Sequence, residues 1–290
     1  MSDNKGFDLA QLDMWGDELE FTVERERIVA YAEATNDPIR EHLEGVYAPP
    51  VFAVVPPFQL MAERTMSVVP DELMMKIQHG EHDFRFHRPI EPGEKLTSRA
   101  KVVGIHGKSS GVTVTTLIEC RGDRGDVVNE QYFVGFFRGG TLDGGYGQPS
   151  PEHTLDEKLR SREPSAQVVQ KFDEDQTFRY SEASGDPMPI HLDDEFAQLM
   201  GLPGIIVHGL CTMAFTSHAV IGHVLGDPSR LRRLAVRFSA PAQPKHTITT
   251  SIWSTGVTPG RVTRETCAFE TVTDEGKTVI KDGLAEFGPF

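Results

Sequence analysis

The sequence predicts an α+β protein built from two related halves. The first observation is a repeat: the segment YAEATNDPIREHLE, starting at Tyr31, recurs as YSEASGDPMPIHLD from Tyr180 (180 − 31 = 149). A second pair, FHRPIEPGEKL from Phe86 and FSAPAQPKHTI from Phe238, follows in the same order (238 − 86 = 152). The third observation is that helical patterns precede a series of β-branched runs in each half. Matches in the same order at nearly the same offset indicate a duplicated domain.

The first half is expected to start with a helix over residues 21–35 (FTVERERIVAYAEAT), whose apolar residues have roughly helical spacing. Prolines at 49, 50, 56 and 57 remove backbone donors from the next stretch. A second helix is therefore expected only from Pro57 onward, so the first central helix is degenerate. Alternating or β-branched runs then predict strands over residues 81–90, 95–107, 111–122 and 127–140.

The second half has clearer helix signals. A short helix is expected to end at Gly185, a residue suited to the left-handed C-cap. Another helical turn follows Asp193, and apolar residues from Leu210 onward form the stripe of a longer, buried helix. Strands are expected over residues 231–242, 246–256, 261–273 and 277–288.

The two halves are separated by residues 141–165, a stretch rich in Gly, Pro and Ser that then becomes charged. This composition is typical of a linker. We therefore expect an N-terminal domain at residues 1–140 and a C-terminal domain at residues 166–290, and a chain of 290 residues is long enough for both cores.

Composition excludes several classes of function. A formal net charge of −14 repels phosphate backbones, so nucleic acid is not an expected partner. No apolar run reaches the ~20 residues of a membrane helix, and the acidic N-terminus lacks the features of a signal peptide. We therefore expect a cytoplasmic protein without a membrane partner. Three widely spaced cysteines fit reduced, structural thiols better than a disulfide framework or a metal knuckle.

The residues that indicate chemistry lie between Tyr180 and Gly209. Asp186 and His191 are five positions apart across a Pro-interrupted segment, and His208-Gly209 opens the long helical pattern. An imidazole suits general base catalysis near neutral pH, and a carboxylate beside it can hold the same water molecule. Free N–H groups at a helix start favour developing negative charge, and glycine allows close approach to the backbone.

These residues resemble a known family. The segment Y-x-x-x-S-G-D-x-x-P-I-H, Ala197 six positions after the histidine, and the later I-x-H-G are similar to the (R)-specific enoyl-CoA hydratase motif of the MaoC-like dehydratases. The resemblance is specific from about Phe178 to Phe287 and weaker in the first half. It implies a double hot-dog fold, with two antiparallel sheets each wrapped on a central helix, in which the C-terminal domain is catalytic and the N-terminal domain has diverged.

The resemblance implies a hydro-lyase that interconverts (R)-3-hydroxyacyl-CoA and trans-2-enoyl-CoA without a metal or other cofactor. Asp186 and His191 would hold water, and the N–H of Gly209 would bind the thioester oxygen. Substrate-binding positions are expected at His208 and Pro189. Two further candidates lie in the densest basic stretch, where they either meet CoA phosphates or balance nearby acids: Arg233 and Arg237. CoA is preferred to an acidic acyl carrier protein because this chain is acidic as well.

Two departures and two rivals accompany this expectation. The family pattern usually has Asn where this chain has Met188, which removes an amide from the loop. In the first half Asp37 and His42 match the pair, but Pro49-Pro50 stands in place of His208-Gly209, so we expect either a relic there or a loop with a substrate-shaping role. The rival functions are a hot-dog acyl-CoA thioesterase and a non-catalytic acyl-thioester-binding subunit. A homodimer is expected because hot-dog sheets have edges that invite pairing.

Three histidines in the first half, at positions 79, 82 and 87, also suggest a metal site. No further ligand is fixed by spacing, and histidines at strand edges are commoner than zinc sites with this pattern. We therefore expect no metal there.

Overall fold

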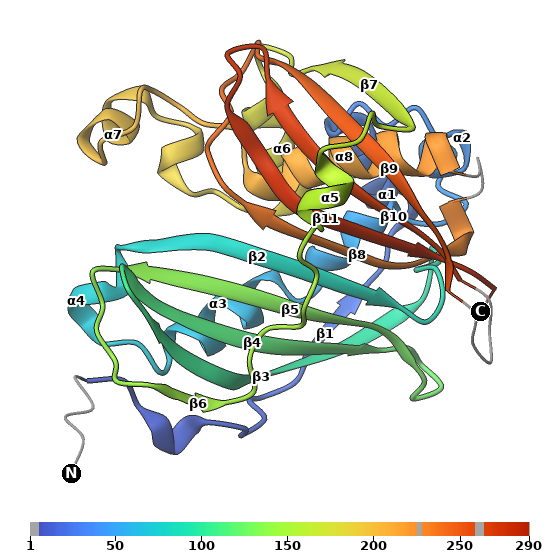
Figure 1. Cartoon of the computed structure of the whole chain (residues 1–290). Coiled ribbons are helices and arrows are strands. Elements are labelled where there is room, and N and C mark those ends of the chain that lie inside the picture. Colours follow the sequence, from blue (N-terminus) through green and yellow to red (C-terminus); the bar gives the residue numbers. More distant parts are fainter. Residues whose placement is uncertain (1–5, 225–227, 259–263, 290) are drawn as a thin grey trace.

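A computed structural model describes residues 6–224, 228–258 and 264–289 of the chain. Within these residues it shows two halves of similar construction, each with a curved antiparallel sheet and helices on its inner side (Figure 1). The first half is coloured blue to green, and the second is coloured yellow to red. The predicted α+β class with duplicated halves is confirmed.

The first half contains short helices on one side of a strongly paired sheet. Its helices are α1 (Arg25–Ala34), α2 (Arg40–Leu43), α3 (Phe58–Met66) and α4 (Asp71–Met74), with 3-10 turns η1 (Leu9–Gln11) and η2 (Pro50–Val54). Its strands are β1 (Leu19–Thr22), β2 (Ile77–Phe86), β3 (Lys95–Lys108), β4 (Gly111–Arg121), β5 (Val127–Arg138) and β6 (Gly145–Gly147).

The second half contains the longest helix, α8 (Gly209–Val224). The other helices are α5 (Glu157–Arg160), α6 (Gln176–Ser184) and α7 (Asp194–Leu199), with 3-10 turns η3 (Pro189–His191) and η4 (Pro228–Arg230). The strands are β7 (Ala166–Lys171), β8 (Leu231–Phe238), β9 (Thr247–Thr258), β10 (Arg264–Thr273) and β11 (Thr278–Phe287).

The long elements agree with the sequence prediction, whereas the first element of each half does not. The expected helix from Phe21 is wrong at its start, because Leu19–Thr22 forms strand β1 against β3 and the helix begins at Arg25. Strand β7 was not predicted. Both are short edge strands, whose side chains alternate between half-buried and exposed, so they lack the long apolar runs that mark the inner strands. The helix expected after Pro57 is α3.

The two predicted sheets are joined along one seam. Strands β2 and β8 pair antiparallel, and the described strands form one 11-stranded sheet in the order β1-β3-β4-β5-β2-β8-β11-β10-β9-β7, with β6 on β3. Figure 1 shows β2 and β8 side by side where the halves meet. The halves therefore share a continuous hydrogen-bonded surface.

The core is also shared. One cluster of buried apolar side chains runs through both halves, and it includes Phe52 from η2 and Phe215 from α8. At its centre the hydroxyls of Tyr31 and Tyr180, which are repeat equivalents, lie 3.3 Å apart. Burial of this apolar surface is the main stabilising contribution to the fold.

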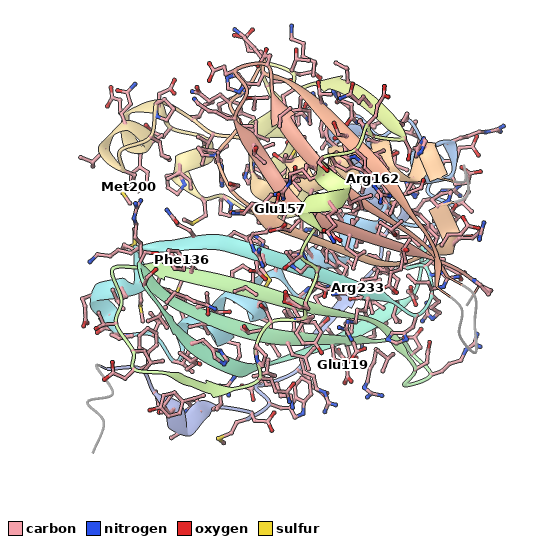
Figure 2. The ribbon with its side chains drawn as sticks, viewed as in Figure 1. Glu119, Phe136, Glu157, Arg162, Met200 and Arg233 are labelled. Carbon is pink, nitrogen blue, oxygen red and sulfur yellow. The ribbon has the colours of Figure 1, made fainter. Side chains whose placement is uncertain are left out.

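The expected linker carries structure of its own. Strand β6 pairs with β3, and α5 lies on the outer face of the second half, where Leu155 packs with Trp253. Figure 2 labels Glu157 and Arg162 on that face. The boundaries at residues 140 and 166 stay a prediction. Among the described helices, none has the length and apolar character needed to span a bilayer.

Candidate active site

Asp186 is held at the end of α6. Gly185 caps this helix with a left-handed φ of 79°, as the sequence predicted, and turns the chain sharply. The Ser181 hydroxyl donates to the Asp186 carbonyl at 2.6 Å, and the Met188 N–H donates to the Asp186 Oδ1 at 3.1 Å. The carboxylate is thus fixed by local bonds that leave its second oxygen free for another partner.

His191 closes the short turn η3 and is buried. Its Nδ1 lies 2.7 Å from the carbonyl oxygen of Ile206. A carbonyl only accepts hydrogen bonds, so Nδ1 carries the proton in the neutral ring. The lone pair is therefore on Nε2, which is the nitrogen able to accept a proton.

His208 packs directly on this imidazole. The two rings are stacked with centroids 3.7 Å apart and planes 24° apart, and Tyr180 lies on His208 at 4.8 Å. His208 Nε2 is 3.3 Å from the Asp186 carbonyl oxygen. One side-chain donor or acceptor atom from each of Asp186, His191 and His208 lies within 4.8 Å of the others. The fold thus brings together three of the residues singled out in the sequence.

Burial shifts the protonation of all three groups. It raises the pKa of Asp186, although the neighbouring His191 opposes the shift. Burial lowers the pKa of His191, and the Ile206 carbonyl only partly compensates. Burial and the nearby His191 lower the pKa of His208 to about 2. Both imidazoles are therefore neutral near pH 7, which leaves Nε2 of His191 available as a base.

Gly209 begins helix α8, where backbone N–H groups have no acceptor within the helix. A Cβ atom at this position would lie 3.2 Å from both Cδ1 and Cε1 of Phe238. The space beside the Gly209 Cα is therefore filled by an aromatic ring. The sequence predicted that the missing side chain of Gly209 lets an acyl group approach the backbone. On the side where a Cβ atom would stand, the group that approaches is the Phe238 ring.

The remaining predicted positions are Pro189, in the same turn as His191, and two arginines. Pro189 is exposed at the start of η3. Arg233 is paired with Asp83 at 2.8 Å and Arg237 with Glu81 at 2.8 Å. Because side chains alternate along β8, both arginines lie on the sheet face opposite Phe238. Figure 2 labels Arg233 on the outer face near the seam. The structure does not bring these arginines to Asp186; they balance nearby acids, and their contact with CoA stays a prediction.

A metal could be held by the Asp186, His191 and His208 donors, which are the group of suitable spacing in the described parts of the chain. The rings of His191 and His208 are stacked, so their in-plane lone pairs do not converge well on one ion. Of the other three histidines considered, His79 contacts His82 at 3.2 Å and His87 contacts Glu130 at 3.0 Å. The prediction of a metal-free site stays a prediction.

The first half contains a second copy of the acid and histidine, with a different arrangement. His42 Nδ1 lies 2.6 Å from Asp37 Oδ2, and His218 Nε2 from α8 lies 3.0 Å from the same oxygen. All three side chains are at most 1% exposed. Pro50 stands where Gly209 is in the second copy, so no N–H is available there.

Three participants had no sequence signal of their own. They are the Ile206 carbonyl that orients His191, the Phe238 ring beside Gly209, and His218, which reaches Asp37 across the halves. The repeat does align Phe238 with Phe86, and this match could have indicated that the ring has the same structural position in both halves.

Comparison with known families agrees with this division into two parts. Residues 153–276 match the MaoC like domain, and residues 36–139 match the MFE-2 hydratase 2 N-terminal domain. The chain is 32% identical to 3-hydroxyacyl-thioester dehydratase Y of Mycobacterium tuberculosis, over 72% of this chain and 72% of that protein. It is 27% identical to a probable enoyl-CoA hydratase 2 of Dictyostelium discoideum, over 94% of this chain and 93% of that protein.

Solved structures show the same fold. A MaoC-like dehydratase from Phytophthora capsici superposes with a TM-score of 0.82 at 26% identity, over 97% of this chain and 98% of that chain. A Mycobacterium tuberculosis protein described as a double hot-dog fold gives a TM-score of 0.60 at 13% identity, over 94% of this chain and 95% of that chain. The second likeness concerns the fold alone.

Proposed function

Because the chain belongs to the MaoC-like dehydratase family, we propose that it is a hydro-lyase interconverting (R)-3-hydroxyacyl-CoA and trans-2-enoyl-CoA. The observation that supports this proposal is that side-chain atoms of Asp186, His191 and His208 lie within 4.8 Å of one another, and that helix α8 begins at the next residue, Gly209. Hydration of an enoyl thioester needs a base, a proton for C2 and stabilisation of charge on the thioester oxygen.

In the hydration direction, a water molecule lies between Asp186 and Nε2 of His191. The imidazole accepts a proton from this water as its oxygen bonds to C3, and Nδ1 stays bonded to the Ile206 carbonyl, which fixes the ring. The double-bond electrons move toward the thioester, and C2 then receives a proton from the protonated pair. One water is added in total, and elimination follows the same path in reverse.

The thioester oxygen carries the developing negative charge. The N–H of Gly209, at the first position of α8, is the donor for it, and the dipole of this helix of 16 residues adds to the stabilisation. His208, predicted as a substrate-binding residue, is instead stacked on the base, so we assign it to positioning His191 rather than to contacting substrate.

The test is a direct assay with short, long and branched 2-enoyl-CoA substrates, following the loss of enoyl-thioester absorbance and the chirality of the 3-hydroxy product. We expect (R)-3-hydroxyacyl-CoA without release of free CoA thiol. Unchanged absorbance with all substrates would contradict hydration, and thiol release at the same rate would indicate a thioesterase instead.

The assembly and location are also proposals. Strand β7 is an edge of the described sheet and exposes Val169, which supports pairing with a second copy in a homodimer. Light scattering of the purified protein tests this. We keep the cytoplasm as the proposed location, although relatives from Drosophila and Arabidopsis carry peroxisomal names.

A further inference from the structure

The two halves are related by a pseudo-two-fold axis that can be located at two points. One is the contact between the Tyr31 and Tyr180 hydroxyls. The other is the pairing of Asp83 in β2 with Ala235 in β8, two positions separated by the repeat offset of 152. Residues on either side of that pair are related across the seam in the same way, so each site has an equivalent place in the other half.

Backbone bonds confirm how the two sites correspond. Val207 N–H donates to the Ala242 carbonyl at 2.8 Å, and Ala48 N–H donates to the Ile90 carbonyl at 2.9 Å. These equivalent bonds place Pro49-Pro50 where His208-Gly209 stands in the second half. By the same relation, Phe86 corresponds to the Phe238 ring that packs beside Gly209.

The first-half copy shows which residue the opposite half contributes. A cavity of about 30 Å³ is lined there by His42, Pro50 and Phe86, together with Leu231 from the second half. Subtracting the repeat offset from Leu231 gives His79 (231 − 152 = 79). His79 therefore takes the equivalent place at the second-half site, and it is contributed by the first half.

The contacts of His79 agree with this placement. Its ring lies between two phenylalanines, with centroid distances of 4.6 Å to Phe238 and 4.6 Å to Phe133. Phe238 in turn lies against Gly209, at the distance where a Cβ atom would crowd it. A packed series of side chains thus leads from the first half to the backbone N–H that serves the thioester oxygen.

A polar chain holds His79 in this position, and its other two side chains, those of His82 and Gln131, are buried. His79 Nε2 is 3.2 Å from His82 Nδ1, and His82 Nε2 is 3.2 Å from Gln131 Oε1. The Gln131 amide donates to the Ala53 carbonyl in η2 at 2.5 Å. Burial lowers the pKa of His79 well below its usual value and that of His82 to about 3, so both rings are neutral. A neutral imidazole can pack against two phenylalanine rings without the free-energy cost of removing a charge from water.

We propose that His79 is a positioning residue of the active site in the opposite half: its ring fixes Phe238 and, through it, the N–H of Gly209. The first half then contributes to catalysis by supplying the His79 ring, in addition to stabilising the fold. The inference rests on the proposed hydratase function only for its kinetic test.

The kinetic test compares three changes at His79. Loss of the ring in His79→Ala lets Phe238 move, and we expect kcat to fall by about 10- to 100-fold with KM nearly unchanged. His79→Gln, which keeps a polar group for His82 but no ring, behaves like Ala. His79→Phe keeps the ring volume and retains kcat within about threefold. Leu231→Ala, the equivalent change at the first-half copy, leaves kcat unchanged and serves as the matched control.

A second measurement does not depend on turnover. In protein labelled with ¹⁵N-glycine, the Gly209 amide signal is identified by its loss in Gly209→Ala. We expect this signal to shift in His79→Ala and to stay in place in Leu231→Ala and His79→Phe. If the wild type hydrates no enoyl thioester, the proposed function fails while this signal still tests the positioning.

The proposal is overturned by any of three results: wild-type kcat in His79→Ala, an equal loss in Leu231→Ala, or rescue by Gln but not by Phe. An unchanged Gly209 signal in His79→Ala likewise overturns it. Circular dichroism of each variant confirms that the compared proteins are folded.

Discussion

The two copies of the acid–histidine pair have the same spacing in the sequence but opposite environments. Asp37 is paired directly with His42 and faces His218 in a sealed core. In the second copy, His191 turns its Nδ1 to the Ile206 carbonyl, so that Asp186 and Nε2 stay free for a third partner. The difference shows that the partner of the histidine Nδ1 decides whether the carboxylate and the imidazole contact each other directly or stay open to a third group. Spacing alone does not.

Their pKa shifts are opposite as well. Burial disfavours both carboxylates, but the imidazoles of His218 and His42 outweigh it and lower the pKa of Asp37. At Asp186 burial prevails and raises the pKa. These opposite shifts fit a structural role for the first copy and the proposed catalytic role for the second.

The largest expected effect comes from removing the base. His191→Ala should lower kcat by about 10²- to 10⁴-fold, because it removes the imidazole that the Ile206 carbonyl orients and whose Nε2 accepts the proton from water. Steady-state kinetics with an enoyl-CoA checks this. His42→Ala is the matched change in the first copy and should retain kcat; loss of turnover in both variants would show that the two copies do not differ in role.

The next effect concerns stability and lies in the first copy. Asp37→Asn should lower the free energy of unfolding at pH 7 by about 1.5 to 3 kcal/mol, since it removes a buried carboxylate that the rings of His42 and His218 both contact. Because the pKa of folded Asp37 is lowered, its contribution is present above the unfolded value of about 3.9 and is lost as pH falls below it. Urea unfolding at several pH values measures this difference.

Arg40→Ala is the control for that experiment, because the Arg40–Glu44 pair is exposed and screened by solvent, so this variant should keep the stability of the wild type. Equal stability of Asp37→Asn and the wild type at pH 7 would contradict the closed pair.

A smaller effect is expected at the start of α8. In Gly209→Ala the new Cβ would meet Phe238 at 3.2 Å, displacing the ring or the backbone N–H, and kcat should fall by about 10- to 100-fold. Gly222→Ala lies in the same helix with open space around its Cβ, so it should retain full activity. Equal kcat in the Gly209→Ala and Gly222→Ala variants would show that close packing at Gly209 is not the cause of any loss of activity.

The smallest expected effect is a gain in stability at Asp186, opposite in sign to the loss expected at Asp37. Since burial raises the pKa of Asp186, its ionised form destabilises the folded state above that pKa. Asp186→Asn should therefore be slightly more stable than the wild type at pH 7, and the gap should close as pH falls through the Asp186 pKa. Thermal melts across this range check the trend; a variant less stable at pH 7 would indicate that Asp186 serves the fold.

Much of this organisation could be predicted from the sequence. The duplication, the helix from Gly209, the cap at Gly185 and the closeness of Asp186 to His191 all follow from local patterns and a repeat. The seam between β2 and β8 could not, because pairing across distant strands leaves no local signal. The same holds for the Ile206 carbonyl, since every residue carries this group.

Arg233 illustrates a different limit. A cluster of basic residues in an acidic chain has the same sequence pattern whether it meets a ligand or nearby acids. Only the positions of Asp83 and Glu286, far away in the chain, show that this guanidinium is already paired.

Helix α8 has a consequence for how this protein can evolve. It begins at Gly209 in the proposed active site, and on a later turn it supplies His218 to the buried carboxylate of the other half. Reopening the first copy would require replacing two prolines, turning His42 away from Asp37 and releasing His218, and the last of these changes alters the helix that begins at Gly209. The divergence of the first copy is therefore hard to reverse by single mutations, because freeing Asp37 from His218 changes a residue of the helix on which the proposed second-half site depends.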